Sequence, residues 1–199
     1  MKKEELVRKG YNEIGQKYMD YRSIFSNLKE LKYILTLLPE NGKILDVGCG
    51  TGVPIARYFV DKGYSVTGID ISETMIELAE QNVPEAKFYR YDMNDLDFPE
   101  LSFDCITAIY SLFHAPKEKH FSILENFHYM LKPKGILFFC VGTNSGDYYG
   151  DDFLGSEMFW SNYPPEKTLS LVKEVGFKIL FEKVLNRGEE LHYWIIAQK

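Results

Sequence analysis

Short apolar runs alternate with amphipathic segments along the 199 residues of this chain. Short apolar runs suit buried strands, whereas segments whose apolar residues recur every three or four positions suit helices with one buried face. The runs predict strands at 43–47, 65–69, 86–90, 105–109 and 136–141, and the amphipathic segments predict helices at 54–62, 73–81, 117–131 and 165–175. This alternation is typical of an α/β domain built around a mostly parallel sheet.

The two ends of the chain depart from this alternation. Residues 1–38 are expected to form two helices before the first strand, because apolar residues recur there at helical spacing and Pro39 ends the second set. Near the other end, strands are predicted at 179–184 and 192–197, and the turn residues between them, 186–188, indicate a hairpin. The sheet is therefore expected to finish on an antiparallel strand.

Residues 143–163 interrupt the alternation with glycines, aromatic residues and carboxylates, and no Lys or Arg occurs between Lys134 and Lys167. A loop of this length in a small domain is usually functional, so we expect it to cap the substrate side. Aromatic rings beside carboxylates favour a neutral or cationic small molecule. The candidate substrate contacts in this insert are Tyr148, Tyr149 and Trp160. The alternative, that its aromatic residues pack and its acids face water, remains open.

The length and the 45% hydrophobic content fit a single domain spanning residues 1–199. Within it we distinguish N-terminal helices that form a lid (1–38), a core (40–142), the capping insert (143–163), and a last helix with the closing hairpin (164–199). Either a monomer or a homodimer is compatible with this sequence.

The charge distribution favours a small-molecule partner. The net charge is −6, and residues 41–100 hold eleven acidic against five basic residues. Nucleic-acid binding normally needs a basic face, and the sequence has no Lys/Arg cluster of that kind. No apolar run approaches the length of a membrane span, and residues 1–9 lack the apolar region of a secretory signal, so a cytoplasmic protein without membrane contact is expected. The three widely spaced cysteines suggest no metal site.

The densest chemical signal is the segment 44–52, a strand that ends in an acid and leads into a G-x-G-x-G turn before a helix. Glycines let the backbone approach a ligand closely. The dinucleotide fingerprint G-x-G-x-x-G would need a glycine at position 53, where this chain has Val53. Asp46, just before the turn, would repel a diphosphate and favours a cationic head group.

Two further acids follow the next two predicted strands. Asp70 lies 18 residues after Gly52, and Asp92 follows the third strand. The carboxyl ends of strands in an open α/β sheet form the ligand-binding edge, where a carboxylate can accept hydrogen bonds from ribose hydroxyls. We therefore expect Asp46, Asp70 and Asp92 along one edge of the sheet.

In this order of motifs, residues 40–142 resemble the class I, Rossmann-like S-adenosylmethionine-dependent methyltransferases. The resemblance implies a seven-stranded, mostly parallel sheet with an antiparallel last strand and helices on both faces. It also implies S-adenosylmethionine as the cofactor, with Asp46 near its amino group, Asp70 on its ribose and Asp92 on its adenine amino group. The other residues that the resemblance assigns to the cofactor are Gly48, Gly50 and Gly52 around the methionine portion, and Ile71 and Met93 beside the adenine.

Two other segments are candidates for contact with the reacting groups. The segment after the fourth strand resembles a family motif that faces donor and substrate, which makes Tyr110 a candidate donor contact and Phe113 a candidate substrate contact. His114 is the candidate general base, with a hydrogen-bonded wall residue as the alternative. Tyr11 and Tyr18 are candidate donor contacts from an N-terminal lid, with plain packing of that helix as the alternative.

The predicted function is methyl transfer from S-adenosylmethionine to a small-molecule acceptor by direct in-line displacement, which requires no metal. Two alternatives stay open at this point. One is a regulatory protein that binds S-adenosylmethionine or S-adenosylhomocysteine without turnover, and the other is a nicotinamide-dependent oxidoreductase.

Overall fold

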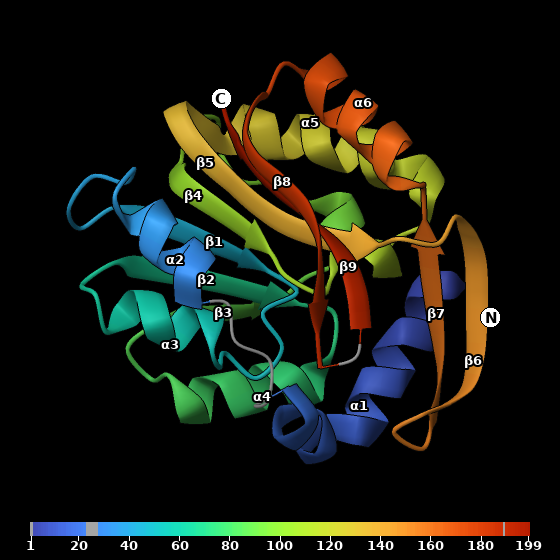
Figure 1. The fold of residues 1–199 in the computed structure, drawn as a ribbon. Coiled ribbons are helices and arrows are strands. Elements are labelled where there is room, and N and C mark those ends of the chain that lie inside the picture. The colour runs from blue at the N-terminus through green and yellow to red at the C-terminus, as the bar shows by residue number, and fades with distance from the viewer. Residues whose placement is uncertain (1, 23–27, 189) are drawn as a thin grey trace.

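A twisted seven-stranded sheet forms the centre of the computed structural model, which describes residues 2–22, 28–188 and 190–199 (Figure 1). Its strands lie in the order β3-β2-β1-β4-β5-β9-β8, and β9 runs antiparallel to both of its neighbours. They are β1 (Lys43–Val47), β2 (Ser65–Asp70), β3 (Lys87–Arg90), β4 (Phe103–Ala108), β5 (Leu131–Gly142), β8 (Lys178–Arg187) and β9 (Glu190–Gln198). The predicted fold class, including the antiparallel last strand, is confirmed.

Helices cover both faces of this sheet (Figure 1). The helices of the described chain are α1 (Lys3–Arg22), α2 (Leu28–Leu35), α3 (Ile55–Val60), α4 (Glu73–Asn82), α5 (His120–Met130) and α6 (Pro165–Val175). Side chains of β5 alternate between the two cores: Leu137 and Phe139 pack with α5 and α6, whereas Phe138 packs with α2, α3 and α4. A strand buried on both faces reads as a continuous apolar run, which is why the sequence located the central strands. No helix among the described residues is long and apolar enough to span a membrane.

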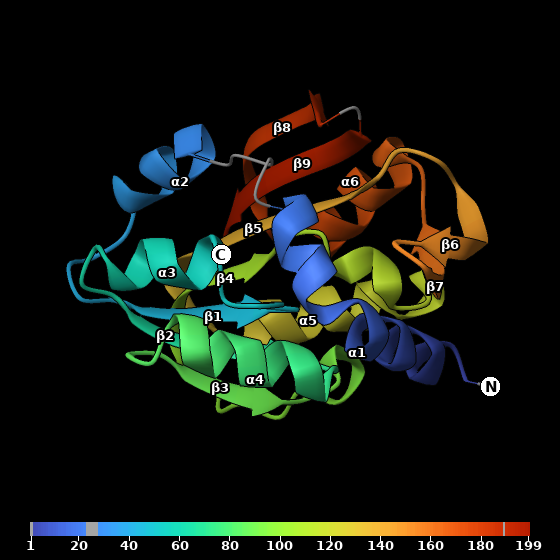
Figure 2. The ribbon, with the colours of Figure 1, turned by 90° about the horizontal axis from the view of Figure 1, so that it is seen from below.

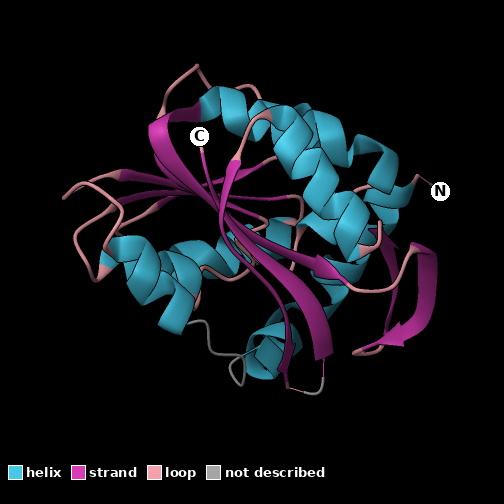
Figure 3. Ribbon diagram, turned by 45° about the horizontal axis from the view of Figure 1, so that its top comes forward, coloured by secondary structure: helices cyan, strands magenta, loops and turns pink. Residues whose placement is uncertain are grey.

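The insert forms a separate two-stranded sheet, made of β6 (Gly146–Phe153) and β7 (Ser156–Asn162) (Figure 3). The sequence did not predict these strands, because β6 is mostly exposed and shows no alternation of apolar and polar residues. Helix α1 lies on β7, and their shared core includes Val7, Ile14, Met158 and Phe159. The helix changes direction at Gly15, as Figure 2 shows.

The helix passes close to β7 at Gly10. A Cβ atom on this residue would lie 2.7 Å from the backbone oxygen of Glu157 and 2.8 Å from Cε of Met158. Only glycine permits that approach without moving one of the two elements. The N-terminal helix and the insert therefore form one packed unit beside the sheet.

Some element boundaries differ from the predicted ones. Strand β5 begins at Leu131 rather than at Ile136, because Leu131 pairs with Phe103 ahead of an irregularity in the register. The preceding α5 begins at His120, after a short 3₁₀ turn at Lys117–Lys119. These shifts leave the order of the elements unchanged.

Candidate functional site

A cleft of about 570 Å³ opens at the carboxyl ends of the central strands, between the glycine turn and α1. A smaller compartment of about 450 Å³ adjoins it, and Tyr18, Gly48, Gly50 and Tyr110 line both. The predicted site residues that line the larger part are Tyr11, Tyr18, Gly48, Gly50, Asp70, Ile71, Asp92, Met93, Tyr110 and His114. The structure thus brings together residues from α1, the ends of β1, β2 and β3, and the segment after β4.

The glycine turn is shaped by contact with the segment after β4. Gly48 has a φ of +68°, and a Cβ atom there would lie 2.3 Å from Cβ of Ser111. The Ser111 hydroxyl donates to the backbone oxygen of Val47 at 2.7 Å, which fixes the two segments together. Any side chain at Gly48 would separate them, so this glycine is required by the close approach.

Asp46 is buried at the end of β1 and lines the smaller compartment. Its Oδ1 atom accepts a hydrogen bond from Oγ1 of Thr107 at 2.7 Å, whereas its buried Oδ2 atom has no hydrogen-bond partner among the described residues. Burial raises the pKa of Asp46 to about 7, and the nearby negative charge of Asp70 adds to this rise. An unsatisfied buried carboxylate oxygen is costly, and a ligand with a cationic group would satisfy it.

Asp70 connects the glycine turn to the start of α4. One carboxylate oxygen accepts from the backbone N–H of Gly50 and the other from that of Ser72, both at 2.9 Å. Burial raises the pKa of Asp70 to about 6, although these N–H groups favour the charged form and oppose the rise. Each carboxylate oxygen can accept a second hydrogen bond, so the group can still bind two hydroxyls on the cleft side.

The third acid stands where the chain leaves β3. Asp92 accepts hydrogen bonds from the backbone and the side-chain amide of Asn94 at 2.9 and 2.8 Å, which orients its carboxylate at the start of a short 3₁₀ turn. Ile71 and Met93 line the same end of the cleft, together with Tyr91. A planar ring with a polar edge fits such a set of one acid and apolar side chains.

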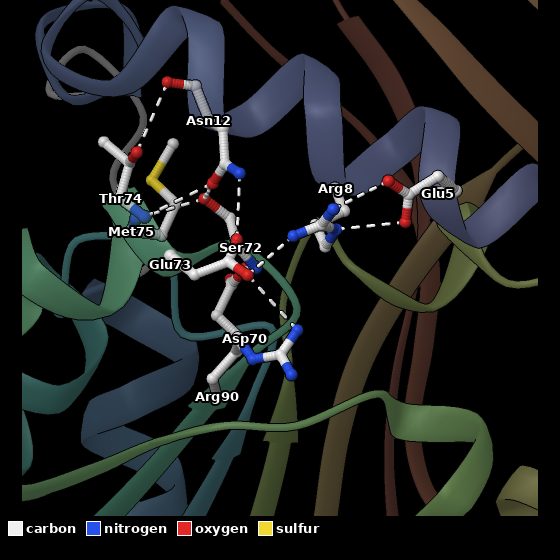
Figure 4. Close-up of polar contacts among 9 residues, drawn as sticks. All are labelled: Glu5, Arg8, Asn12, Asp70, Ser72, Glu73, Thr74, Met75 and Arg90. Carbon is white, nitrogen blue, oxygen red and sulfur yellow. Dashed lines mark hydrogen bonds and ion pairs between the residues drawn. The ribbon is translucent and has the colours of Figure 1, made fainter.

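Helix α1 covers the cleft and is tied to the end of β2 by Asn12 (Figure 4). The Asn12 side chain accepts from the Ser72 hydroxyl at 2.6 Å and donates to Glu73 at 2.9 Å. On the same helix, Arg8 forms an ion pair with Glu73 at 2.6 Å. The Ser72 hydroxyl also caps α4, so a single residue joins the covering helix, the α4 cap and the strand end that holds Asp70.

The two predicted tyrosines of α1 meet edge to face at a centroid distance of 5.1 Å, and each contacts a different part of the cleft wall. The ring of Tyr18 would lie 3.5 Å from a Cβ atom on Gly50, so it covers the glycine turn. The hydroxyl of Tyr11 lies 2.7 Å from Nε2 of His114. The other ring nitrogen of His114, Nδ1, lies 2.7 Å from the backbone oxygen of Phe159 in β7.

Other predicted residues lie outside the cleft. Phe113 is buried between the rings of His114 and His192, at centroid distances of 4.8 and 5.6 Å. Tyr148 and Tyr149 are 43% and 61% exposed on the outer strand of the insert. Trp160 lies next to His114, with the two ring centroids 6.0 Å apart. Gly52 packs against α4 and β3. The substrate roles expected for the four aromatic residues remain predictions.

The sequence analysis missed several residues of this site. Thr107 and Ser111 hold Asp46 and the glycine turn, and Asn12 ties down α1. Thr107 lies in the predicted fourth strand and Ser111 in the segment that follows it, which offered a weak signal for these two residues. Nothing in the sequence pairs Asn12 with Ser72, because the two residues lie 60 positions apart.

Comparisons with known proteins agree on the class that this fold and site define. The family model described as "Methyltransferase domain" matches residues 44–135. A Bacillus subtilis (strain 168) protein named YqeM, with a provisional methyltransferase assignment, is 28% identical over 195 residues, covering 88% of this chain and 78% of the relative. A demethylmenaquinone methyltransferase of Thermotoga maritima is 27% identical over 207 residues, covering 86% of this chain and 88% of the relative.

A solved structure agrees as well. An S-adenosylmethionine-dependent methyltransferase from Methanosarcina mazei superposes with a TM-score of 0.73 at 27% identity, covering 84% of this chain and 96% of that one. The chain belongs to the class I S-adenosylmethionine-dependent methyltransferases. It is accordingly an enzyme that uses S-adenosylmethionine, as the motifs predicted.

The residues present fit this cofactor. The unsatisfied oxygen of Asp46 suits its ammonium group, and Asp70 can accept hydrogen bonds from its ribose. Gly48 and Gly50 line the part of the cleft between these two acids and place no side chain there. The cleft therefore matches an extended molecule with a cationic end and a ribosyl centre.

Proposed function

We propose that this methyltransferase acts on a small-molecule acceptor by direct in-line displacement. The main support is the arrangement of Asp46, Asp70 and Asp92 around one cleft, beside the glycine turn and beneath α1. In this proposal Asp46 binds the ammonium group of the donor, Asp70 its ribose hydroxyls and Asp92 its adenine amino group. The donor supplies an activated methyl group on a positively charged sulfur.

The residues of the chain then act by position. Ile71 and Met93 hold the adenine, Tyr18 covers the glycine turn, and Tyr11 with His114 borders the region where the acceptor must approach. Such a reaction gains chiefly from alignment of nucleophile and methyl group and from exclusion of water. The acceptor is expected to lose its proton on the side of the cleft where His114 lies.

The size of the cover supports a small acceptor. Beyond the donor-binding sheet and its helices, the described chain adds only α1 and the hairpin of β6 and β7 above the cleft. The rings of Tyr11 and Tyr18 from α1, together with that of Tyr110 after β4, line the cleft and favour a planar, neutral or cationic molecule. Because a relative is named for demethylmenaquinone, the reduced form of that compound is a suitable first acceptor to test.

An isotope-transfer assay tests this function. The protein is incubated with methyl-labelled S-adenosylmethionine and either reduced demethylmenaquinone or a cell extract of low molecular mass. We expect a labelled small product, and we expect Gly50→Arg to abolish it by filling the turn under Tyr18. Binding of S-adenosylhomocysteine without any labelled product would indicate a ligand-binding protein without turnover. Thermal stabilisation by NAD but not by S-adenosylhomocysteine would indicate an oxidoreductase.

A further inference from the structure

The hydrogen bonds of His114 define which of its nitrogens holds the proton. A backbone carbonyl can only accept, so the 2.7 Å contact with Phe159 requires a proton on Nδ1 of His114. In the neutral ring, Nε2 then has a lone pair and accepts from the Tyr11 hydroxyl at 2.7 Å. The basic nitrogen of His114 therefore faces Tyr11, which stands between it and any acceptor that approaches Nε2 in line with its lone pair.

The pair is held rigidly by neighbouring rings. Tyr11 and His114 are 8% and 7% exposed, and their rings meet edge to face at a centroid distance of 5.2 Å. Tyr18 supports Tyr11 at 5.1 Å, and Trp160 supports His114 at 6.0 Å. These contacts come from α1, β7 and the segment after β4, so the hydrogen-bonded pair exists only when the three segments are docked together.

We infer that Tyr11 is the group that takes the proton from the methyl acceptor and that His114 receives the proton of Tyr11. This inference rests on the proposed function. As the bond between the methyl carbon and the acceptor atom forms, the electron pair of the breaking S–CH3 bond stays on sulfur. The acceptor proton moves to the Tyr11 oxygen, which has acceptor lone pairs, while the Tyr11 proton moves to Nε2 of His114. The products are the methylated acceptor, S-adenosylhomocysteine, neutral Tyr11 and protonated His114.

The relay also specifies the acceptor. A nucleophile that needs such a relay bears a proton that it must lose, as in a hydroxyl group, an amine with an N–H bond or an acidic C–H bond. A thioether or a tertiary amine has no proton to give and would gain nothing from it. We therefore expect acceptors of the first kind.

Two conservative variants separate the roles of the pair. Tyr11→Phe keeps the ring and removes the hydroxyl, whereas His114→Gln can keep both hydrogen bonds but cannot accept a proton. With whichever acceptor the isotope-transfer assay identifies, we expect each variant to lower kcat by ~10²-fold, typical of lost acid–base catalysis. We expect the double variant to be no slower than the worse single one, because the two residues act as a unit. Binding of S-adenosylhomocysteine should stay within about threefold, because this inference places the Tyr11 hydroxyl and the His114 imidazole toward the acceptor rather than the donor.

The dependence of kcat on pH gives a readout that a purely structural role would not move. The wild type should lose activity toward acid as His114 becomes protonated, and this limb should vanish in His114→Gln. The other titratable groups among the described residues that line the cleft or its smaller compartment are Glu4, Tyr18, Asp46, Cys49, Asp70, Tyr91, Asp92 and Tyr110, and both variants retain them. Tyr129→Phe at an exposed position of α5 and His128→Gln at a half-buried position of the same helix, neither of which lines the cleft, are the matched controls and should behave as wild type.

Nitrogen NMR of the whole protein with bound S-adenosylhomocysteine tests the geometry without turnover. We expect neutral His114 to be protonated at Nδ1 and unprotonated at Nε2 in the wild type. Protonation at Nε2 instead would overturn the relay, and so would wild-type kcat in Tyr11→Phe. If the wild type methylates nothing, the proposed function has failed; if it methylates an acceptor that Tyr11→Phe methylates equally well, only the relay has failed.

Discussion

At the scale of single residues, the site depends on carboxylates that are buried before any ligand arrives. Asp46 has one satisfied and one unsatisfied oxygen, whereas Asp70 accepts hydrogen bonds from backbone N–H groups. The positions of both acids at strand ends could be predicted from the sequence. The unsatisfied oxygen of Asp46 could not be predicted, because the hydrogen bonding of this carboxylate depends on Thr107, from a strand 61 residues away.

We predict that Asp46→Asn weakens S-adenosylhomocysteine binding by roughly tenfold to a hundredfold at pH 8, about the loss of one charged hydrogen bond. Because burial raises the pKa of Asp46 to about 7 and that of Asp70 to about 6, wild-type binding should also weaken as the pH falls from 8 to 5.5. The variant should show a smaller change over this range. Calorimetric titration at several pH values measures both effects.

Asp97→Asn, on an exposed loop, serves as the control for that titration. It should bind like the wild type at every pH. Equal affinity of Asp46→Asn and wild type at pH 8 would contradict the assignment of Asp46 to the ammonium group.

At the scale of elements, α1 acts as a cover that is fastened at two opposite points. Consecutive residues reach opposite sides of the cleft: Tyr11 contacts His114 after β4, and Asn12 contacts Ser72 after β2. Lys3 and Lys117 both form ion pairs of 2.7 Å with Asp147, which attach the hairpin to α1 and to the segment before α5. In the proposed function the donor lies beneath this element, so we expect α1 to move when the donor is exchanged.

We predict that Asn12→Ala accelerates release of S-adenosylhomocysteine by ~10-fold, because it removes hydrogen bonds worth about 1 to 2 kcal/mol from the closed arrangement. Stopped-flow displacement of the bound product measures this rate. Gln16→Ala, at an exposed position of the same helix, should leave the rate unchanged. An unchanged rate in Asn12→Ala would mean that opening of α1 does not limit release.

The elements themselves were largely predictable, and the exceptions have a common cause. Strands buried on both faces and helices with one apolar face follow from hydrophobic period. The hairpin of β6 and β7 was not predicted, because its stability comes from α1 rather than from its own alternation. The sequence analysis expected the N-terminal helices to form a lid and singled out Tyr11, but nothing in it paired Tyr11 with His114 or Asn12 with Ser72.

At the scale of the whole molecule, the buried acids couple ligand binding to folding. A carboxyl group whose pKa is raised in the folded state binds more protons there than in the unfolded chain, so unfolding becomes easier as the pH rises through that range. For Asp46 and Asp70 this range lies between about 4 and 7. The lowered pKa of Glu73, to about 2, which follows from its hydrogen bond with Asn12, acts in the opposite sense and only at lower pH.

We predict that the free energy of unfolding of the ligand-free protein falls between pH 5 and pH 8 and that Asp46→Asn reduces this fall. At pH 8 the variant should equal or exceed the wild type in stability while binding the donor less well, since a buried charge has been removed. Urea unfolding at the two pH values, followed by circular dichroism, measures the effect. A steeper fall in the variant would contradict the burial of a charged Asp46.

The docking of α1 on β7 also determines when the site can form as the chain folds. Glu13 of α1 accepts a hydrogen bond from Ser156 at a separation of 143 residues, so the covering helix meets its partner late. Until the hairpin has been synthesised, the apolar side chains of α1 that it will cover lack this packing surface. Completion of the catalytic cleft should therefore be one of the last events in folding, governed by a contact of high sequence separation.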